Sequence, residues 1–422
     1  MRKVLVIAYY WPPAGGPGVQ RWLKFVKYLQ DFGIQPIVYV PENPHYPIID
    51  PKLEKEIPTD VQILKQPISE PYSWASILSK KRTKKISSGI IQEKEQSLIE
   101  KAMLWIRGNL FIPDARKFWV KPSIQFLTSI IKQEQIETVI TTGPPHSLHL
   151  IGLGLKKMLK IQWVADFRDP WTSIGYHKKL RLTVGSQKKH KHLEKEILTK
   201  ADKIITTSKT TANEFRAITD KSIKVITNGY DGPINEPNLD SEFTISHLGS
   251  LLTGRNPRSL WNVLKEIVAE NAEFANDLKI QLAGVVGGEV LESISENGLT
   301  RFTTQMGYLD HEKVQQVQRN SLVLLLLEID SVETQGIIPG KLFEYMNARR
   351  PILAMGPSNW EAGEMVNEMS LGNYVSSDNP MAIKQVILDW YSAYKKDTLK
   401  VGAVGVEKFH RKELTKELAN FI

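Results

Sequence analysis

The chain has 422 residues, of which 41% are hydrophobic and 24% charged, so we expect a folded protein of two or three domains and not a disordered one. It contains no cysteine, which excludes disulfides, thiolate metal sites and a cysteine nucleophile. With 55 Lys and Arg against 46 Asp and Glu, the net charge is +9, which suits a phosphate-bearing ligand, an anionic membrane surface or a nucleic acid.

A short apolar run, residues 4–8, follows the basic start of the chain. It resembles the core of a signal peptide, but it ends in Tyr-Tyr-Trp-Pro without the small residues of a cleavage site. We therefore predict a buried first strand and a cytoplasmic protein. The longest apolar run, residues 322–327, is far shorter than the ~20 residues that span a membrane.

Short apolar runs alternate with amphipathic stretches along the rest of the chain. In the first half the predicted strands are 4–8, 36–40, 61–64, 138–142, 162–165, 203–207 and 223–226, and the predicted helices are 20–30, 123–132, 148–159 and 193–200. In the second half the predicted strands are 244–248, 280–283, 322–327 and 352–355, and the predicted helices are 259–270, 311–318, 341–347 and 381–394. Continuous apolar strands separated by helices predict parallel sheets that are covered on both faces.

A stretch rich in Pro, Gly and Asn, residues 231–238, marks the predicted boundary between two such domains. We predict an α/β protein of two Rossmann-like, doubly wound parallel-sheet domains, 1–232 and 233–405. A polar C-terminal helix is expected over residues 406–422, one option being that it packs back toward the N-terminal domain.

The segment 67–121 interrupts this alternation and is predicted to be an insertion in the N-terminal domain. Its basic residues are densest at Lys80, Lys81, Arg82, Lys84 and Lys85, and its tryptophans are Trp74, Trp105 and Trp119. Two interpretations stay open: a solvated insertion, or an element on an anionic membrane surface, with Lys and Arg at lipid phosphates and Trp in the interface. The second would make the protein peripheral on the inner face of the cytoplasmic membrane. Nucleic acid is not expected as a partner, because no known nucleic-acid-binding motif lies nearby.

Candidate site residues follow the strands, because open α/β sheets bind ligands at the carboxyl ends of their strands. Gly15, Gly16 and Gly18 precede a helix, and we expect their loop to touch an anionic or sugar group, with a purely structural turn as the alternative. The loop is not Gly-x-Gly-x-x-Gly, so no nicotinamide cofactor is predicted. His146 follows the strand 138–142 and is a candidate hydrogen-bonding or acid/base residue, although a lone histidine is often structural.

Three charged residues, Asp166, Arg168 and Asp169, end the next strand. Burying them is unfavourable unless they pair with one another or meet a ligand. Either Arg168 forms an internal ion pair, or Arg168 meets a phosphate while a carboxylate lies near a substrate hydroxyl. In the second half, Arg255 precedes a helix and suits a diphosphate, and Gly284 belongs to a second glycine-rich strand exit.

The most informative segment of the second half is a loop that enters a helix, residues 334–345. Gly336 and Gly340 lie in the loop, Lys341 in the first helical turn and Glu344 one turn in. A carboxylate at that place can accept both hydroxyls of a ribose, while loop amides and Lys341 hold phosphates. We therefore predict a nucleotide site here.

Together these residues resemble the retaining nucleotide-sugar glycosyltransferases of GT-B fold, glycosyltransferase family 4. The resemblance covers nearly the whole chain except 67–121, and it is strongest over 336–356, which is similar to the family's donor-binding loop and helix. The runs 226–231 and 306–309 support it. It implies two domains that face a cleft, with the donor mainly on the second and the acceptor on the first.

The family's Glu-x7-Glu pattern places its second Glu at Glu344, which implies ribose binding there. The first Glu falls at Gly336, so the sugar contact that it usually makes is unassigned. Arg255 lies near the place of the usual phosphate-binding lysine. Arg168 stands where the family often has a histidine, next to Asp169.

The resemblance implies a retaining, hexosyltransferase-type enzyme that moves a sugar from a nucleotide-diphosphate donor, expected to be a UDP-sugar. The implied acceptor is a glycan or lipid-linked molecule in surface polysaccharide biosynthesis. We expect His146, Arg168 and Asp169 to be catalytic, with no metal and no cofactor beyond the UDP-sugar substrate, because positive side chains replace the metal. A sugar-nucleotide epimerase, a phosphorylase and a non-catalytic nucleotide-sugar-binding protein are the alternatives, because a fold does not fix a function.

Overall fold

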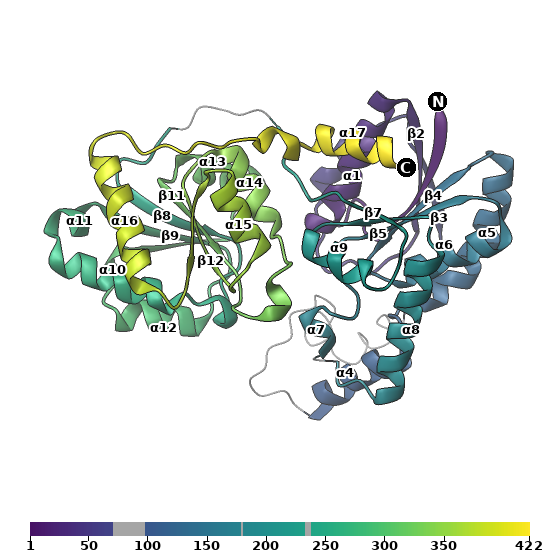
Figure 1. Cartoon of the computed structure of the whole chain (residues 1–422), viewed down its shortest axis with the longest axis horizontal. Coiled ribbons are helices and arrows are strands. Elements are labelled where there is room, and N and C mark those ends of the chain that lie inside the picture. Colours follow the sequence, from purple (N-terminus) through teal and green to yellow (C-terminus); the bar gives the residue numbers. More distant parts are fainter. Residues whose placement is uncertain (71–97, 179, 233–237) are drawn as a thin grey trace. The chain divides into compact units, whose positions relative to one another are not determined.

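The computed structural model describes residues 1–70, 98–178, 180–232 and 238–422, and it divides into two compact units (Figure 1). The first unit holds Met1–Asn228 and Arg411–Ile422, and the second holds Gly229–His410. The chain therefore leaves the first unit once and returns to it at its end. The domain limits expected from the sequence, 232/233 and 405/406, lie a few residues from these breaks.

The first unit is built on a parallel sheet with the strand order β3-β2-β1-β4-β5-β6-β7. Its strands are β1 (Arg2–Ile7), β2 (Ile34–Pro41), β3 (Gln62–Gln66), β4 (Thr138–Gly143), β5 (Gln162–Phe167), β6 (Lys203–Thr206) and β7 (Ser222–Val225). Its helices are α1 (Pro17–Leu29), α4 (Leu98–Leu110), α5 (Lys117–Gln133), α6 (Ser147–Met158), α7 (Gly175–Lys178), α8 (Val184–Lys200), α9 (Lys209–Arg216) and α17 (Arg411–Phe421).

Helices cover both faces of this sheet, because alternate residues of a strand point in opposite directions. Val4 and Val6 of β1 share a buried cluster with Trp22 of α1. Leu5 and Ile7 of the same strand share another with side chains of α5 and α6. The C-terminal segment joins the first cluster through Leu414, Leu418 and Ile422.

The second unit repeats the architecture with the strand order β10-β9-β8-β11-β12-β13, again with parallel pairing. Its strands are β8 (Phe243–Leu248), β9 (Leu278–Ala283), β10 (Thr303–Gly307), β11 (Val323–Leu327), β12 (Ile352–Gly356) and β13 (Gly372–Ser376). Its helices are α10 (Arg258–Glu270), α11 (Ala272–Asp277), α12 (Gly288–Glu296), α13 (His311–Asn320), α14 (Gly340–Ala348), α15 (Glu361–Glu368) and α16 (Pro380–Lys395).

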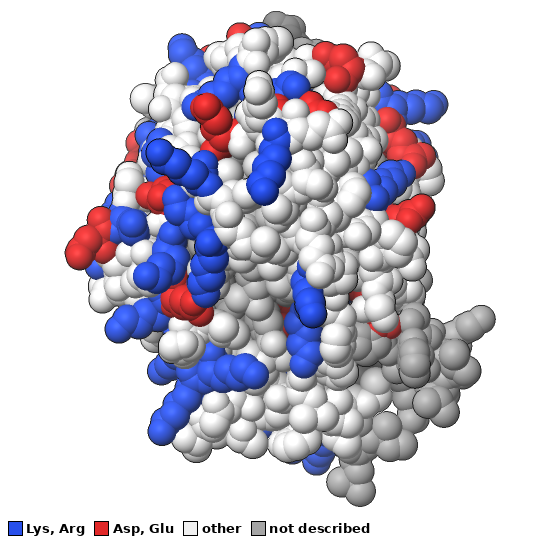
Figure 2. Space-filling view, turned by 90° about the vertical axis from the view of Figure 1, so that its right-hand side faces the viewer, with Lys and Arg blue, Asp and Glu red and all other residues white. Residues whose placement is uncertain are grey.

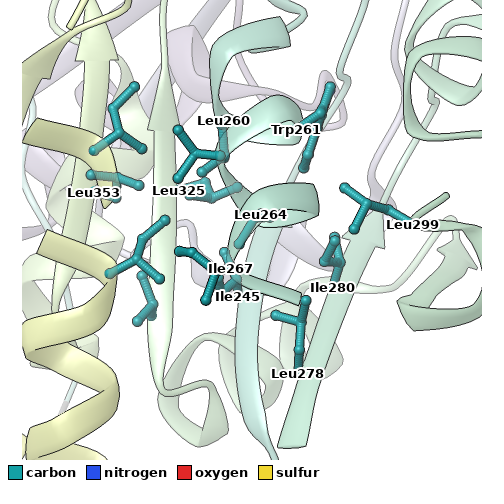
Figure 3. Close-up of a cluster of buried hydrophobic side chains, with 14 of the residues drawn as sticks. Ile245, Leu260, Trp261, Leu264, Ile267, Leu278, Ile280, Leu299, Leu325 and Leu353 are labelled. Carbon is teal, nitrogen blue, oxygen red and sulfur yellow. The ribbon is translucent and has the colours of Figure 1, made fainter. Parts of the chain in front are cut away.

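One face of this second sheet is packed by α10, as Figure 3 shows. Leu260, Leu264 and Ile267 come from the helix, and Ile245 and Leu325 come from the strands beneath it. The neighbouring residues of β11 point to the other face, where they meet α14 and α15. The two Rossmann-like α/β domains expected from the sequence are thus confirmed.

The segment 67–121 turns out to be only partly an insertion. Residues 71–97, with Trp74 and the five-residue basic cluster at 80–85, lie outside the described residues. Trp119 is only 1% exposed and stacks on Tyr39 of β2 with ring centroids 4.8 Å apart. The prediction that Trp119 could anchor in a membrane was therefore wrong, because the residue fills the core under α5. Within the described ranges, no helix is long and apolar enough to cross a bilayer.

Candidate functional site

Two glycines bring the loops after β8 and β9 into backbone contact in the second unit. Gly249 and Gly284 have φ angles of +117° and +105°. Residues with a Cβ rarely adopt this backbone conformation. A Cβ on Gly284 would lie 2.8 Å from the backbone carbonyl of Gly249. The predicted glycine-rich exit at Gly284 is therefore a close approach of two loops at the carboxyl edge of the sheet.

Lys341 faces this pair of loops from the first turn of α14. Its Nζ lies 3.1 Å from where a Cβ on Gly249 would be. Among the described residues it makes no salt bridge, although it is partly buried. Burial and the charge of Arg255 lower the pKa of Lys341 to about 8. An ammonium without a counter-ion at a helix N-terminus favours an anionic ligand.

His247, inside β8, holds the ammonium of Lys341 in place. Its Nδ1 lies 3.3 Å from the carbonyl oxygen of Leu325, an acceptor only, so Nδ1 carries the proton. Its Nε2 is then free to accept from Nζ of Lys341 at 3.4 Å. Burial, followed by the charge of Lys341, keeps the pKa of His247 well below its usual value, so the ring stays neutral.

Arg255 is engaged in an ion pair that the sequence did not reveal. Its Nε and Nη2 contact the carboxylate of Glu328, at the end of β11, at 2.7–3.1 Å. The Glu328 side chain is 1% exposed, whereas that of Arg255 is 37% exposed. The expectation that the whole guanidinium is available to a phosphate is therefore corrected. Nε and Nη2 bond to Glu328, and Nη1 is the nitrogen that a ligand can reach.

Glu344 lies one turn along α14 and is oriented by a neighbouring helix. Its Oε2 accepts a hydrogen bond from Nε2 of Gln318 in α13 at 2.8 Å. Gln318 is 2% exposed, so this contact is shielded from water. The other carboxylate oxygen stays available to accept from a ligand.

The loop that contains Gly336 and leads to Gly340 is fixed from the side. The indole N–H of Trp360 donates to the carbonyl oxygen of Ile337 at 2.7 Å. The backbone N–H of Glu361 donates to the carbonyl oxygen of Gln335 at 2.9 Å. Gly340 begins α14, which no side chain caps, so its first amides are left for a ligand.

The three glycines of the first unit have different surroundings. A Cβ on Gly15 would lie 2.9 Å from Ile48, and its N–H donates to the carbonyl oxygen of Ile48 at 3.0 Å. Gly16, with φ of +100°, has no atom near its open side, and Gly18 lies under the guanidinium of Arg168. Gly15 is thus held by the protein, while Gly16 and Gly18 line the edge of the sheet.

Arg168 lies where the loops after β1, β4 and β5 meet. Its Nη2 donates to the carbonyl oxygen of Pro144, and its Cζ lies 5.8 Å from the ring centre of Tyr10. Its Nη1 fills the space that a Cβ on Gly18 would need, so only glycine fits beside it. Its Nε has no hydrogen-bond partner in the described part of the chain.

The internal ion pair that the sequence suggested exists, but with other partners. Asp166 is fully buried and pairs with Arg21 of α1, Nη2 to Oδ1 being 2.9 Å. Trp22 and Thr142 donate to its Oδ2 at 2.7 and 2.8 Å. Burial raises the pKa of Asp166, but the charge and hydrogen bonds around it outweigh this and keep it below the usual value. Arg168 is therefore not the partner of this carboxylate.

His146 and Asp169 lie in opposite environments. His146 is 4% exposed and stacks on Trp171 with ring centroids 4.7 Å apart. Neither of its ring nitrogens has a partner among the described residues, and burial holds its pKa well below the usual value. Asp169 is an exposed residue, although burial of its carboxyl raises the pKa of that group. Of the two, Asp169 is the one open to a substrate hydroxyl.

Sequence reasoning did not assign His247, Gln318 or Glu328 to the positioning of the predicted residues; it noted Glu328, with Asp330, only as a weak substitute for a metal-binding Asp-x-Asp motif. The apolar run before Gly249 predicted the strand, but no pattern in the sequence predicted that His247 of this strand would face Lys341. Among the residues described, no group of three or more His, Asp or Glu is placed to hold a metal ion.

Residues 92–232 match the family model described as Glycosyltransferase Family 4. The match takes in residues 92–121, so the expectation that the resemblance excludes all of 67–121 was wrong. No curated protein gives a significant sequence match to the chain.

Three solved structures illustrate the similarity of fold. A glycosyltransferase from Rickettsia africae is 14% identical, with a TM-score of 0.62, covering 99% of this chain and 97% of its own. A TarM variant from S. aureus, solved with Fondaparinux, alpha-GlcNAc-glycerol and UDP, is 13% identical, with a TM-score of 0.59 and coverage of 100% and 99%. A putative UDP-N-acetylglucosamine 2-epimerase from Listeria monocytogenes is 14% identical, with a TM-score of 0.52 and coverage of 99% and 94%.

Identities this low carry the fold alone, and both transferases and an epimerase share it. The sequence match is more specific, because it falls on the third of the chain that holds His146, Arg168 and Asp169. The chain therefore has the GT-B fold of these glycosyltransferase structures, and its residues 92–232 match the model of Glycosyltransferase Family 4.

Proposed function

We propose that the protein is a retaining glycosyltransferase that moves a sugar from a nucleotide-diphosphate donor to a glycan or lipid-linked acceptor in surface polysaccharide biosynthesis. The observation that carries the proposal is Lys341, whose ammonium lies at the start of α14 beside Gly249 without a counter-ion among the described residues. A diphosphate supplies the missing negative charge. The presence of UDP in the TarM structure supports uridine as the base.

In this proposal the second unit binds the donor. Glu344 accepts the ribose hydroxyls through its free oxygen, while Lys341 and the first amides of α14 hold the diphosphate. Nη1 of Arg255 adds a further donor from the rim. These groups are fixed before the ligand arrives, so they stabilise the charge that develops on the departing diphosphate without reorganisation, and no metal is needed.

In the first unit, Asp169 is the proposed partner of the acceptor hydroxyl, because it is an exposed residue just after β5 whose carboxyl pKa is raised by the protein around it. Arg168 offers an unpartnered Nε and meets an anionic group of a substrate. His146 is too enclosed to exchange protons readily with a substrate, so we assign it to packing against Trp171 in the core.

A sugar-nucleotide epimerase is the second candidate, favoured by the fold that the chain shares with the putative epimerase. An epimerase interconverts nucleotide sugars without an acceptor. A non-catalytic binding protein is the third candidate, because Gly336 supplies no side chain to the sugar.

The decisive experiment measures binding of UDP-, GDP- and ADP-sugars by calorimetry and then identifies the products with and without lipid-extract acceptors. Transfer requires an acceptor-dependent release of UDP together with a new glycoside. An altered UDP-sugar formed without acceptor would replace the proposal by epimerisation. Tight binding of a nucleotide sugar without any product would support the non-catalytic binding protein.

A further inference from the structure

Helix α4 of the first unit has apolar side chains on two sides, and the protein covers only one of them. Leu104 is 3% exposed and packs against Leu180, which lies in the short loop before α8. Trp105, Ile106 and Leu110 are 42%, 41% and 55% exposed. A surface helix usually keeps one apolar stripe and turns it to the core. The second stripe of α4 therefore lacks a partner within the described chain.

The exposed stripe continues onto the start of α5. Phe118 is 51% exposed and lies next to Phe111, with ring centroids 6.2 Å apart. Nζ of Lys117 lies over both rings, at 5.4 and 5.2 Å, and donates to the carbonyl oxygen of Leu110 at 2.6 Å. The end of α4 and the start of α5 thus present one apolar surface with a cation in it.

A basic segment borders this surface, brought there from a distant part of the sequence. The side chain of Asn109 bonds the backbone of Arg181 and Thr183 at 3.2 and 2.8 Å, which fastens α4 to the start of α8. Beyond it, α8 exposes Lys188, Lys189 and Lys191. The charge of Lys189, after burial, lowers the pKa of Lys117, so the two ammonium groups are close.

No acidic residue offsets these charges in the sequence from 175 to 192. Figure 1 places α4 and α8 side by side at the lower end of the first unit, and the lower left of Figure 2 shows Lys and Arg with few Asp or Glu among them. We call the exposed residues Trp105, Ile106, Leu110 and Phe118, with Lys117, Lys188, Lys189 and Lys191, the α4–α8 surface.

We infer that the α4–α8 surface binds the headgroup layer of an anionic lipid membrane. Exposed Trp, Leu and Phe beside lysines are the composition of an interfacial element: the apolar side chains enter the boundary of the acyl chains while the ammonium groups meet lipid phosphates. The inference does not depend on catalysis. It restricts the membrane interpretation of residues 67–121 to the end of α4 and the start of α5, and it adds the lysines of α8.

The test is co-sedimentation of the whole protein with phosphatidylcholine vesicles that contain or lack phosphatidylglycerol. The protein should bind only the anionic vesicles, and less at high salt, because the charges are exposed. Neutralising Lys188, Lys189 and Lys191 to Gln should weaken partitioning on the order of 100-fold. Replacing Trp105 and Ile106 by Ser should weaken it independently, since both side chains leave water on binding.

The matched control neutralises three exposed lysines of the second unit, Lys265, Lys313 and Lys400, to Gln. Its net charge equals that of the α8 variant, so it should bind vesicles like the parent. Failure of the parent to sediment at low salt, or equal weakening by the control, would overturn the assignment to this surface. Equally tight binding of a single-stranded oligonucleotide, insensitive to the Ser substitutions, would replace the membrane by a nucleic acid.

Discussion

Lys341 is a largely buried lysine that makes no salt bridge within the described residues. Lys341→Met should weaken the binding of UDP by about 1.5–3 kcal/mol, because a charge-assisted contact to phosphate is lost. The binding of uridine should stay nearly unchanged. With its pKa lowered to about 8, Lys341 loses its proton as the pH rises through that value, so UDP affinity should fall there. Calorimetry below and above that pH should show the dependence in the parent and not in the variant. Equal loss of uridine and UDP would assign Lys341 to the base or to folding.

Glu344 and Gln318 make a complementary prediction about the ribose. Gln318→Leu removes the shielded hydrogen bond that orients the Glu344 carboxylate. The binding of both uridine and UDP should therefore weaken by about 1 kcal/mol. Glu344→Ala should cost more, about 1.5–3 kcal/mol, since a charged acceptor is lost. Gln316→Leu is the control, because it lies on the same helix but is exposed. Unchanged uridine binding in the Gln318 variant would mean that Gln318 only packs α13 against α14.

At the scale of elements, the ion pair Arg21–Asp166 ties α1 to β4 and β5. Removing one partner leaves a buried charge without compensation, so Arg21→Met should lower the free energy of unfolding by roughly 3–5 kcal/mol. Lys157→Met breaks an exposed pair with Glu196 and should cost less than about 1 kcal/mol. Urea unfolding followed by circular dichroism measures both. Equal effects of the two substitutions would mean that water reaches Asp166.

The same elements show how far the sequence predicts the fold. Central strands such as β1 and β11 were predicted to within a few residues, because burial on both faces leaves a continuous apolar run. The edge strands β10 and β13 were missed, since half of their residues face solvent and no such run exists. Loop glycines and Lys341 were recognised because backbone approach and helix entry have local signals.

The partners of those site residues could not be predicted in the same way. Arg255 and Glu328 are 73 positions apart, and Gln318 and Glu344 are 26 apart. Each pair forms only because strand order brings two helices or loops to one edge of the sheet. A single sequence gives the type of each charged residue but not which opposite charge the topology will bring to it, which is why Arg168, and not Arg21, was considered as the ion-pair donor.

At the scale of the whole molecule, buried histidines are distributed unequally between the two units. The first unit encloses His146, His149, His177 and His190, and the second encloses His247. Burial lowers the pKa of each from 6.5, to about 3 for His149 and about 4 for His177. The folded units therefore hold these rings neutral while the unfolded chain protonates them.

Between about pH 6.5 and the lowered values near pH 4, the unfolded chain binds more protons, so this contribution is fully present above pH 6.5 and is lost as the pH falls. Each ring contributes about 1 kcal/mol of loss between pH 6.5 and pH 5.5. Glu194, whose pKa burial raises, acts in the opposite direction and offsets part of it.

The first unit should therefore lose stability faster than the second as the solution is acidified. Scanning calorimetry of the whole chain from about pH 7 to about pH 5 should show one transition moving down in temperature more steeply. His177→Phe should flatten that transition's pH dependence by about one histidine's share, whereas His192→Gln, at an exposed position of α8, should leave it unchanged. Parallel movement of both transitions, or equal effects of the His192 and His177 substitutions, would mean that the enclosed rings reach water in the folded state. His146 would then again be a candidate for the group that exchanges a proton with the acceptor.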